Sequence, residues 1–230
     1  MIAVLWSGEG LLAVDKPAGV PVIPGRSESA GLALRGRLEE QLGRPLWVIH
    51  RLDRDTSGVL LFALDAATHR AASLAFEQGL PRKEYLALVS PPLPAALLVE
   101  AALVPARRSR MRVAGPGENG KAAVTELAPV DAWGDVGLVE ARPLTGRTHQ
   151  IRVHLRHAGA PLLVDPQYGR PDPVTERALG GGSDGVVLAR TPLHAARLVL
   201  PGSKGLPSLD VRAPFPADMA RAVELLRQRR

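Results

Sequence analysis

The chain has 230 residues, 46% of them hydrophobic, which is enough to bury an aliphatic core, and its formal net charge of +6 favours a polyanionic partner. It contains no cysteine, which excludes disulfides and thiolate chemistry and is typical of a reducing cytoplasm. No apolar run approaches the length that crosses a membrane, and no basic start precedes one, which argues against a secreted or membrane protein. We therefore expect a cytoplasmic protein with one domain over residues 1–230.

Short strands and helices alternate at the start of the chain. Two apolar runs, residues 2–6 and 11–14, predict a β-hairpin. Beyond it, Ser29 can cap a helix that ends at Gly43. The apolar residues of this helix recur at a spacing of four and are Leu34, Leu38 and Leu42. The spacing predicts a helix that packs on one side.

In the segment 47–64 a charged insert separates two aliphatic runs. Both runs predict buried strands, and the insert, residues 50–58, ends in Thr-Ser-Gly, which favours a turn. Carboxylates and guanidinium groups are costly to bury unless they pair, so the insert either faces solvent or forms a site around Asp53. A triad of Ser57, His50 and Asp53 is disfavoured, because Ser57 lacks the Gly-x-Ser-x-Gly elbow of such nucleophiles.

A second helix and a strand follow the insert. Asp65 can cap the helix and Gly79 can close it. Its packing side is expected to contain Ala67, Ala71 and Leu74. The strand covers residues 81–89, and from the residues alone Tyr85 within it is a cross-strand packing residue.

The segment 107–127 predicts a basic hairpin with its turn at residues 114–120. The arginines of its first arm are Arg107, Arg108, Arg110 and Arg112. Such a run is either a solvated face or a surface for RNA phosphates, which supply affinity without reading sequence. We favour contact with RNA.

A strand over residues 138–143 leads to a helix that Thr148 can cap and Gly159 can end. Its core side contains Ile151, Leu155 and Ala158. Another side contains His149, Arg152 and Arg156 and is expected to be cationic. The last helix of the chain is predicted to pack through Met219, Val223 and Leu226.

Three histidines, His149, His154 and His157, invite comparison with a zinc site. His154 and His157 lie three residues apart on the predicted helix and could both ligate a metal. No cysteine or nearby carboxylate completes the ligand set, so we expect no metal.

Residues 50–58, His-Arg-Leu-Asp-Arg-Asp-Thr-Ser-Gly, resemble the signature of the RluA-type family of RNA pseudouridine synthases. Further segments that resemble the family are residues 15–19, 83–85, 147–169 and 193–195. The resemblance runs from about Leu11 to Phe215, with one departure at Val164, where the family commonly has glycine. We expect the separate N-terminal RNA-binding module of many relatives to be missing.

The resemblance implies that the chain converts uridine in rRNA or tRNA to its C-glycoside isomer, pseudouridine, without a cofactor. Asp53 is then the catalytic carboxylate, Arg152 its ion-pair partner, and Tyr85 stacks on a uracil that has been flipped out of the RNA. The expected RNA contacts are Arg51, Lys16 at the rim of the site, Arg107, Arg108, Arg110, Arg112, Arg147 and His149. Asp53 can capture C1′, add to C6 or remove a ribose proton, and the sequence leaves all three routes open.

The expected fold is α+β, with a mostly antiparallel, curved mixed sheet, packed helices and a central basic cleft. We expect a monomer that binds RNA and neither a membrane nor a protein partner. Two other functions stay open. A nucleosidase or glycoside hydrolase could use Asp53 and Asp55 and would release free uracil. A non-catalytic RNA-binding or chaperone module would bind RNA in a salt-dependent manner and change no nucleoside.

Overall fold

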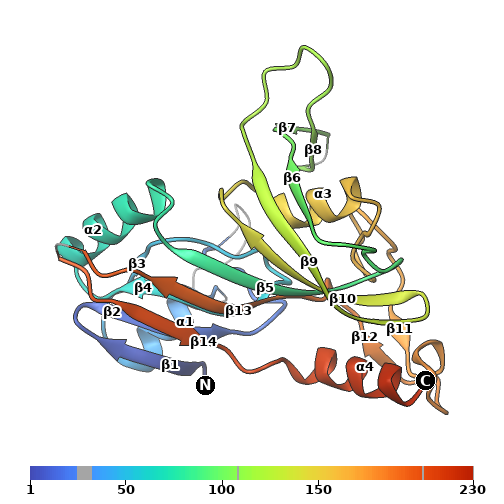
Figure 1. The fold of residues 1–230 in the computed structure, drawn as a ribbon. Helices are drawn as coiled ribbons and strands as arrows, with labels where there is room; N and C mark the ends of the chain where they lie inside the picture. Colours follow the sequence, from blue (N-terminus) through green and yellow to red (C-terminus); the bar gives the residue numbers. More distant parts are fainter. Residues whose placement is uncertain (25–32, 108, 204, 230) are drawn as a thin grey trace. The chain divides into compact units, whose positions relative to one another are not determined.

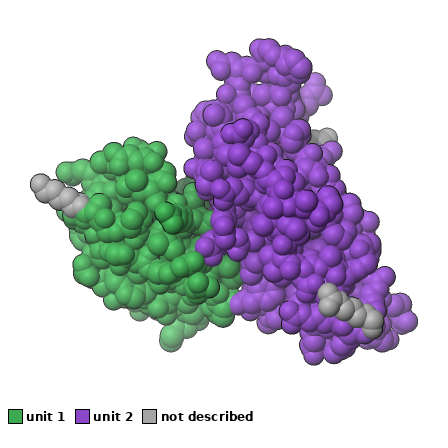
Figure 2. Space-filling model, in the orientation of Figure 1, with its two compact units in different colours: residues 1–83, 194–214 green, residues 84–193, 215–230 purple. Residues whose placement is uncertain are grey.

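A computed structural model describes residues 1–24, 33–107, 109–203 and 205–229. The chain forms two compact units, which Figure 2 shows in green and purple. Unit 1 comprises residues 1–83 and 194–214, and unit 2 comprises residues 84–193 and 215–230. A single catalytic domain over the whole chain stays a prediction. Within the described ranges, no helix is long and apolar enough to cross a membrane.

Unit 1 is built on a mixed sheet. Its strands are β1 (Ala3–Gly8), β2 (Leu11–Lys16), β3 (Trp47–Val48), β4 (Ser57–Ala63), β13 (Leu193–Leu200) and β14 (Leu209–Arg212). The predicted hairpin is β1 with β2, and β2 pairs antiparallel with β4. β13 pairs with β4 in parallel and with β14 antiparallel (Figure 1). The predicted strands on both sides of the charged insert are β3 and β4, and the first of them has only two residues.

β4 is the central strand of unit 1, and all seven of its residues are buried. β2 lies along one side of it, while β13 and β3 share the other side. The predicted turn at Thr-Ser-Gly is wrong at its end, because Ser57 and Gly58 already belong to the strand. Gly58 has φ +109°, and a Cβ there would clash with the carbonyl oxygen of Ala195. Glycine is therefore required for the close approach of β13.

Helix α1 (Leu34–Leu42) ends as predicted, because Gly43 adopts the left-handed conformation with φ +65°. Leu34 and Leu38 are buried, whereas Leu42 is 36% exposed. The helix begins after Ala33, and the proposed cap, Ser29, lies outside the described residues.

Helix α2 (Ala66–Glu77) has the predicted cap, since Oδ1 of Asp65 accepts the Thr68 N–H at 2.8 Å. The predicted packing side is wrong by one residue. The buried residues are Thr68, Ala72 and Ala75, while Leu74 is 53% exposed. The Thr68 hydroxyl also donates to Oδ2 of Asp65 at 2.8 Å, so this buried hydroxyl has a partner within the cap.

Unit 2 is built on a four-stranded antiparallel sheet with the order β5, β10, β9, β6. Its strands are β5 (Arg82–Val89), β6 (Leu97–Glu100), β9 (Val124–Trp133) and β10 (Val136–Pro143). Two short hairpins accompany the sheet, β7 (Leu103–Pro105) with β8 (Met111–Val113) and β11 (Val174–Thr175) with β12 (Val186–Leu188). The helices are α3 (Gln150–His157), the 3₁₀ helix η2 (Arg177–Leu179) and α4 (Ala217–Gln228).

The basic hairpin differs from its prediction in pairing. Its strands are β7 and β8, so the turn lies between Pro105 and Met111 and not at residues 114–120. The later segment does bend back, but it returns to Leu103, whose main chain exchanges two hydrogen bonds of 2.9 Å with Lys121. Ser109, at φ +57°, supplies the tight conformation of the real turn.

Helix α4 packs through the predicted Met219, Val223 and Leu226, which join the core of unit 2. Val164, the departure from the family pattern, is fully buried in the same core. The α+β class is confirmed, since each unit combines a sheet, mixed or antiparallel, with packed helices. The central basic cleft stays a prediction.

Candidate active site

Lys16 fixes the loop that contains Asp53. Its side chain is 0% exposed, and Nζ donates hydrogen bonds of 2.8 Å to the carbonyl oxygens of Pro17, Arg54 and Thr56. Three acceptors match the three N–H donors of an ammonium group, which makes burial of the charge tolerable. Lys16 is therefore not the exposed cation that the prediction of an RNA contact at the rim requires. It holds the loop from inside.

Asp53 lies on the surface of this loop. Its side chain is partly exposed, and its neighbour Leu52 is buried and anchors the loop to the core. The main-chain N–H of Thr56 donates to the carbonyl oxygen of Asp53 at 3.2 Å, which closes the turn. Arg51 is exposed, as a contact with RNA requires. The loop thus holds the carboxylate at the surface of unit 1.

The two ends of the motif are also anchored. At its start, Nε2 of His50 accepts the Leu61 N–H at 3.1 Å, and the imidazole stacks on Phe76 with 4.5 Å between ring centroids. Burial first, and the charge of Lys83 second, lower the pKa of His50 to about 3, so the ring is neutral at neutral pH. Because this nitrogen is engaged by the main chain, His50 does not activate a nucleophile.

At the end of the motif, Oγ of Ser57 and Nδ1 of His194 share a hydrogen bond of 3.0 Å, and both residues are buried. His194 comes from β13, within the segment 193–195 that resembles the family. Ser57 thus pairs with a histidine other than the one in the disfavoured triad, and it serves to join β4 to β13.

Arg152, on α3 of unit 2, is 7% exposed and forms a bidentate ion pair with Asp165. Nε donates to Oδ2 at 2.8 Å and Nη2 to Oδ1 at 2.7 Å, while Nη2 also reaches Oε1 of Gln167 at 2.9 Å. The ring of Tyr168 lies 4.8 Å from the guanidinium carbon. Two carboxylate oxygens and an aromatic face therefore fix the plane of the guanidinium.

Asp165 was not predicted as the partner of Arg152, although it lies in the segment 147–169 that resembles the family. Its Oδ1 also accepts the N–H groups of Gln167 and Tyr168, at 2.9 and 3.1 Å. An aspartate that can bond the main chain two residues on is a turn signal, and this was the available clue. The pairing of Arg152 with Asp53 stays a prediction. A guanidinium has five N–H donors, so the pair with Asp165 does not preclude it.

Tyr85 is 9% exposed on β5 and lies opposite Ala141 of β10. On this face of the sheet Ala141 is followed by Pro143, opposite Thr125 of β9. Thr125 bonds two side chains of α3, Gln150 at 2.9 Å and His154 at 2.8 Å. Tyr85 and the helix that carries Arg152 therefore belong to the same face of the unit 2 sheet.

The N-terminus of α3 differs from its prediction. The cap position is His149, in the left-handed conformation with φ +55°, and no side chain caps the helix, so the assignment of Thr148 was wrong. Oε1 of Gln150 instead accepts the N–H of Arg147 at 2.9 Å and the hydroxyl of Thr145 at 2.8 Å. Arg147 is exposed and donates from Nε to the carbonyl oxygen of Ala122 at 3.0 Å.

The expected cationic face of α3 is divided, because Arg152 is buried whereas Arg156 is exposed. His154 uses both ring nitrogens in hydrogen bonds, to Thr125 and to the carbonyl oxygen of Ala101. Burial is the main cause that lowers its pKa. These contacts explain the histidine without a metal. Among the described residues, no group of His, Cys, Asp and Glu side chains could hold a metal ion.

The arginines of the β7–β8 hairpin differ in their surroundings. Arg107 is exposed, Arg110 is partly exposed, and Arg108 lies outside the described residues. Arg112 forms a bidentate pair with Glu118, at 2.5 and 2.6 Å, which raises the pKa of the guanidinium and lowers that of the carboxyl to about 2. Any contact of Arg112 with a phosphate must therefore compete with Glu118.

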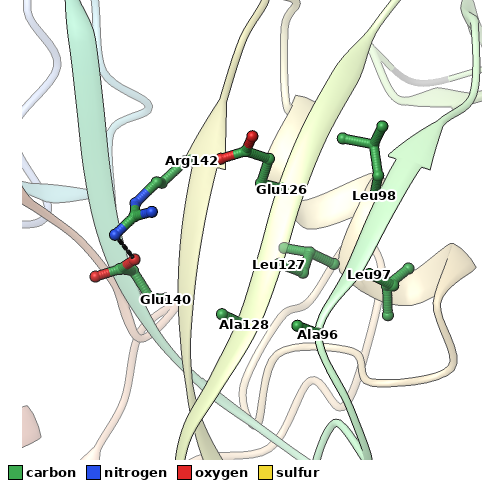
Figure 3. Close-up of a pocket in the computed structure, with 8 residues that line it drawn as sticks. All are labelled: Ala96, Leu97, Leu98, Glu126, Leu127, Ala128, Glu140 and Arg142. Carbon is green, nitrogen blue, oxygen red and sulfur yellow. Dashed lines mark ion pairs between the residues drawn. The ribbon is translucent and has the colours of Figure 1, made fainter.

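A pocket of about 430 Å³ opens on unit 2 between β6, β9 and β10 (Figure 3). Its charged residues are Glu126, Glu140 and Arg142, and the last two form an ion pair of 2.6 Å. Arg142 and Glu140 alternate with Ala141 along β10, so they lie on the face opposite to that of Tyr85. This pocket is separate from the candidate active site.

Comparisons with known proteins show which family this chain resembles. The family model described as RNA pseudouridylate synthase matches residues 10–157. Ribosomal large subunit pseudouridine synthase D of Nitrosomonas europaea is 36% identical over 98% of this chain and 65% of its own length. Ribosomal large subunit pseudouridine synthase C of Escherichia coli is 34% identical over 99% of this chain and 70% of its own. The chain thus spans about two thirds of the length of these relatives.

Solved structures show the same fold. Human RNA pseudouridylate synthase domain containing 4 matches with a TM-score of 0.78 and 26% identity, over 98% of this chain and 93% of the human one. Human RNA pseudouridylate synthase domain containing 1 matches with a TM-score of 0.76 and 25% identity, over 99% and 95% of the two chains. Both matches extend over the two units of this chain.

Proposed function

Because this chain belongs to the RNA pseudouridylate synthase family, we propose that it isomerises uridine to pseudouridine in the RNA of the large ribosomal subunit. The observation that carries the proposal is the loop of Asp53, which Lys16, His50 and Ser57 anchor so that a partly exposed carboxylate is held on a rigid support. The net charge of +6 suits an RNA substrate.

The reaction breaks the N1–C1′ bond, turns the uracil and joins C5 to C1′. No atoms are gained or lost except an exchanged proton, and no electrons are transferred, so the residues can perform it without a cofactor. Asp53 supplies the carboxylate, which can capture C1′, add to C6 or remove a ribose proton. A neighbouring cation favours the ionised form of the carboxylate, and Arg152 is the proposed source.

The ion pair with Asp165 affects both the charge and the orientation of the Arg152 guanidinium. The bidentate pair neutralises much of the positive charge, so Arg152 would act on Asp53 mainly through correctly aimed N–H donors. The buried pair also keeps the guanidinium from rotating when RNA is absent. Pre-alignment of this kind avoids a cost of reorganisation when the substrate binds.

Tyr85 is proposed to stack on the uracil after the nucleotide has been flipped out of the RNA. Flipping costs a few kcal/mol, and stacking of a base on an aromatic ring returns about 1–3 kcal/mol. Arg51, which is exposed beside Asp53, is proposed to occupy the gap in the RNA or to bind its backbone. Arg107, Arg108, Arg110, Arg147 and His149 are proposed as phosphate contacts. A tRNA substrate, a monomeric state and a cytoplasmic location stay predictions.

Release of tritium from RNA labelled at C5 of uridine tests the proposal, because C5 loses its hydrogen when it bonds to C1′. We expect release from large-subunit rRNA and a loss of about a thousandfold or more in Asp53→Asn, which removes the ionised carboxylate. Asp55→Asn is the matched control from the same loop and should retain activity. A loss in both variants, together with free uracil, would instead identify a nucleosidase. Binding without tritium release from any RNA would identify a non-catalytic module.

A further inference from the structure

We propose that Tyr168 is a positioning residue that holds the β7–β8 hairpin against the start of α3 and aligns Arg152. The inference rests on the proposed function, because it assigns binding of RNA to the hairpin and catalysis to Arg152. Tyr168 is 6% exposed and packs in a small core with Leu103, Val153 and, at its edge, Met111. Its hydroxyl and its ring make different contacts, which can be tested separately.

The hydroxyl joins the hairpin to α3. Its oxygen accepts the main-chain N–H of Met111 at 2.7 Å and shares a second hydrogen bond, also 2.7 Å, with Nδ1 of His149. Met111 is the first residue of β8 and His149 is the cap position of α3, so one oxygen bridges the two elements. The rings of His149 and Tyr168 meet edge to face, with centroids 5.5 Å apart and a 75° angle between them.

The hairpin needs support from the rest of unit 2, and the Tyr168 hydroxyl supports β8 where the hydrogen bonds between Leu103 and Lys121 support β7. Each of its strands has only three residues, and a two-stranded hairpin of this size is not stable by itself in water. In the pairing of β7 with β8, Met111 lies opposite Pro105. Arg110 and Arg112 flank Met111, so fixing the main chain at Met111 also fixes where these two side chains begin. Loss of the hydrogen bond to Met111 should make the positions of Arg110 and Arg112 less well defined. The net charge of the hairpin would not change.

The ring and main chain of Tyr168 act on Arg152. The ring supports the guanidinium at 4.8 Å, and the Tyr168 N–H donates to the same Asp165 oxygen that Nη2 of Arg152 bonds. The guanidinium therefore lies between the ring and the carboxylate. Through its hydroxyl, Tyr168 thus contacts the hairpin that is proposed to bind the RNA backbone. Through its ring, it contacts Arg152, which is proposed to act on the reacting carboxylate.

Tyr168→Phe separates the two parts, because it keeps the ring and removes the hydroxyl. The Met111 N–H then loses its partly buried hydrogen bond to the hydroxyl, and because one hydrogen bond corresponds to about a tenfold effect, this amide should exchange its hydrogen about tenfold faster. In the tritium-release assay with large-subunit rRNA, KM should rise about threefold to tenfold while kcat stays within about twofold. Tyr168→Leu removes the ring as well, and its kcat should be about tenfold lower than that of Tyr168→Phe.

A double variant tests whether the hydroxyl acts through the hairpin. Arg110→Ala alone should raise KM, and adding Tyr168→Phe should raise it little further, because the arginine that the anchor places is already gone. KM effects that multiply, or an unchanged exchange rate at Met111 in Tyr168→Phe, would overturn the inference. Hydrogen exchange needs no RNA, so it tests the contact between Tyr168 and Met111 even if the wild-type protein releases no tritium. Absence of tritium release would refute the proposed function and leave this test unaffected.

Discussion

This molecule buries one cation in each unit, Lys16 at the end of β2 and Arg152 on α3, and the two have opposite uses. In unit 1 the ammonium of Lys16 bonds three main-chain carbonyl oxygens and supports a loop whose proposed functional group, Asp53, is a different residue. In unit 2 the guanidinium of Arg152 is itself the proposed functional group, and the carboxylate of Asp165 supports it. The difference shows two uses of a buried charge. Bonded to main-chain carbonyl oxygens, it supports a loop, and paired with a carboxylate, it can itself be the proposed functional group.

The partner also decides what a substitution leaves behind. Without Lys16, the loop keeps neutral carbonyl groups that lack a donor. Without Asp165, the protein keeps a buried guanidinium that lacks its carboxylate. An uncompensated charge costs more than unsatisfied carbonyls, so substitution of Asp165 should destabilise the protein more than substitution of Lys16.

The largest expected effect is that of Asp165→Ala. Breaking a buried ion pair by removing one partner costs about 3–5 kcal/mol, and we expect this loss in the free energy of unfolding, measured with urea. The double variant Arg152→Met, Asp165→Leu should regain most of this stability, because no charge is left buried, and still release no tritium. If the single variant lost less than 1 kcal/mol, the pair would not be a buried one in solution.

Lys16→Met should come next, with a loss of about 2–3 kcal/mol, because three hydrogen bonds to a charged donor disappear while no charge remains. Turnover should fall together with loop order, whereas the dissociation constant for RNA should stay within about twofold, since Lys16 is 0% exposed. Greater destabilisation than in Asp165→Ala would reverse the comparison between the two buried cations.

A pH dependence should follow from His50. The pKa of His50 in the folded protein, about 3, lies below the ordinary value of 6.5, so the unfolded chain takes up the proton first as the pH falls. The stabilisation is fully present above pH 6.5 and is lost towards pH 3. Between pH 7 and pH 4 the free energy of unfolding should decrease, and the decrease should be smaller in His50→Gln, whose side chain does not titrate. Equal pH profiles for the two proteins would contradict the burial of a neutral ring.

The smallest effect should come from the exposed pair of Arg112 and Glu118. Glu118→Gln should leave the melting temperature nearly unchanged, because exposed ion pairs contribute little. It should strengthen binding of RNA by about twofold and steepen the salt dependence, because Arg112 no longer shares its charge with a carboxylate. Unchanged binding would indicate that Arg112 does not contact RNA.

Much of the fold could be predicted where side chains carry a strong local signal. The β1–β2 hairpin, the cap at Asp65 and the packing side of α4 all follow from apolar periodicity and cap chemistry. The packing side of α2 was wrong because alanine gives little contrast between faces. The cap of α3 was wrong because His149 adopts a left-handed conformation that no pattern announces.

The site was predictable only in part. The motif around Asp53 is contiguous, so it can be recognised from the sequence, and the exposure of Asp53 and Arg51 agrees with it. The support for the site is not contiguous. Lys16 lies 38 residues from Arg54, and Met111 lies 57 residues from Tyr168, although each pair is hydrogen-bonded. Such partners emerge only from the tertiary structure.

The pairing of β4 with β13 has a consequence for how the protein is made. The motif ends at Gly58, yet the strand and the histidine that complete its support arrive 137 residues after Ser57. While the nascent chain is shorter than this, β4 lacks its parallel neighbour and Ser57 lacks the imidazole. Assembly of unit 1 must therefore wait until translation has passed β13, which delays completion of the support for the Asp53 loop until residues 84–193 of unit 2 have also been synthesised.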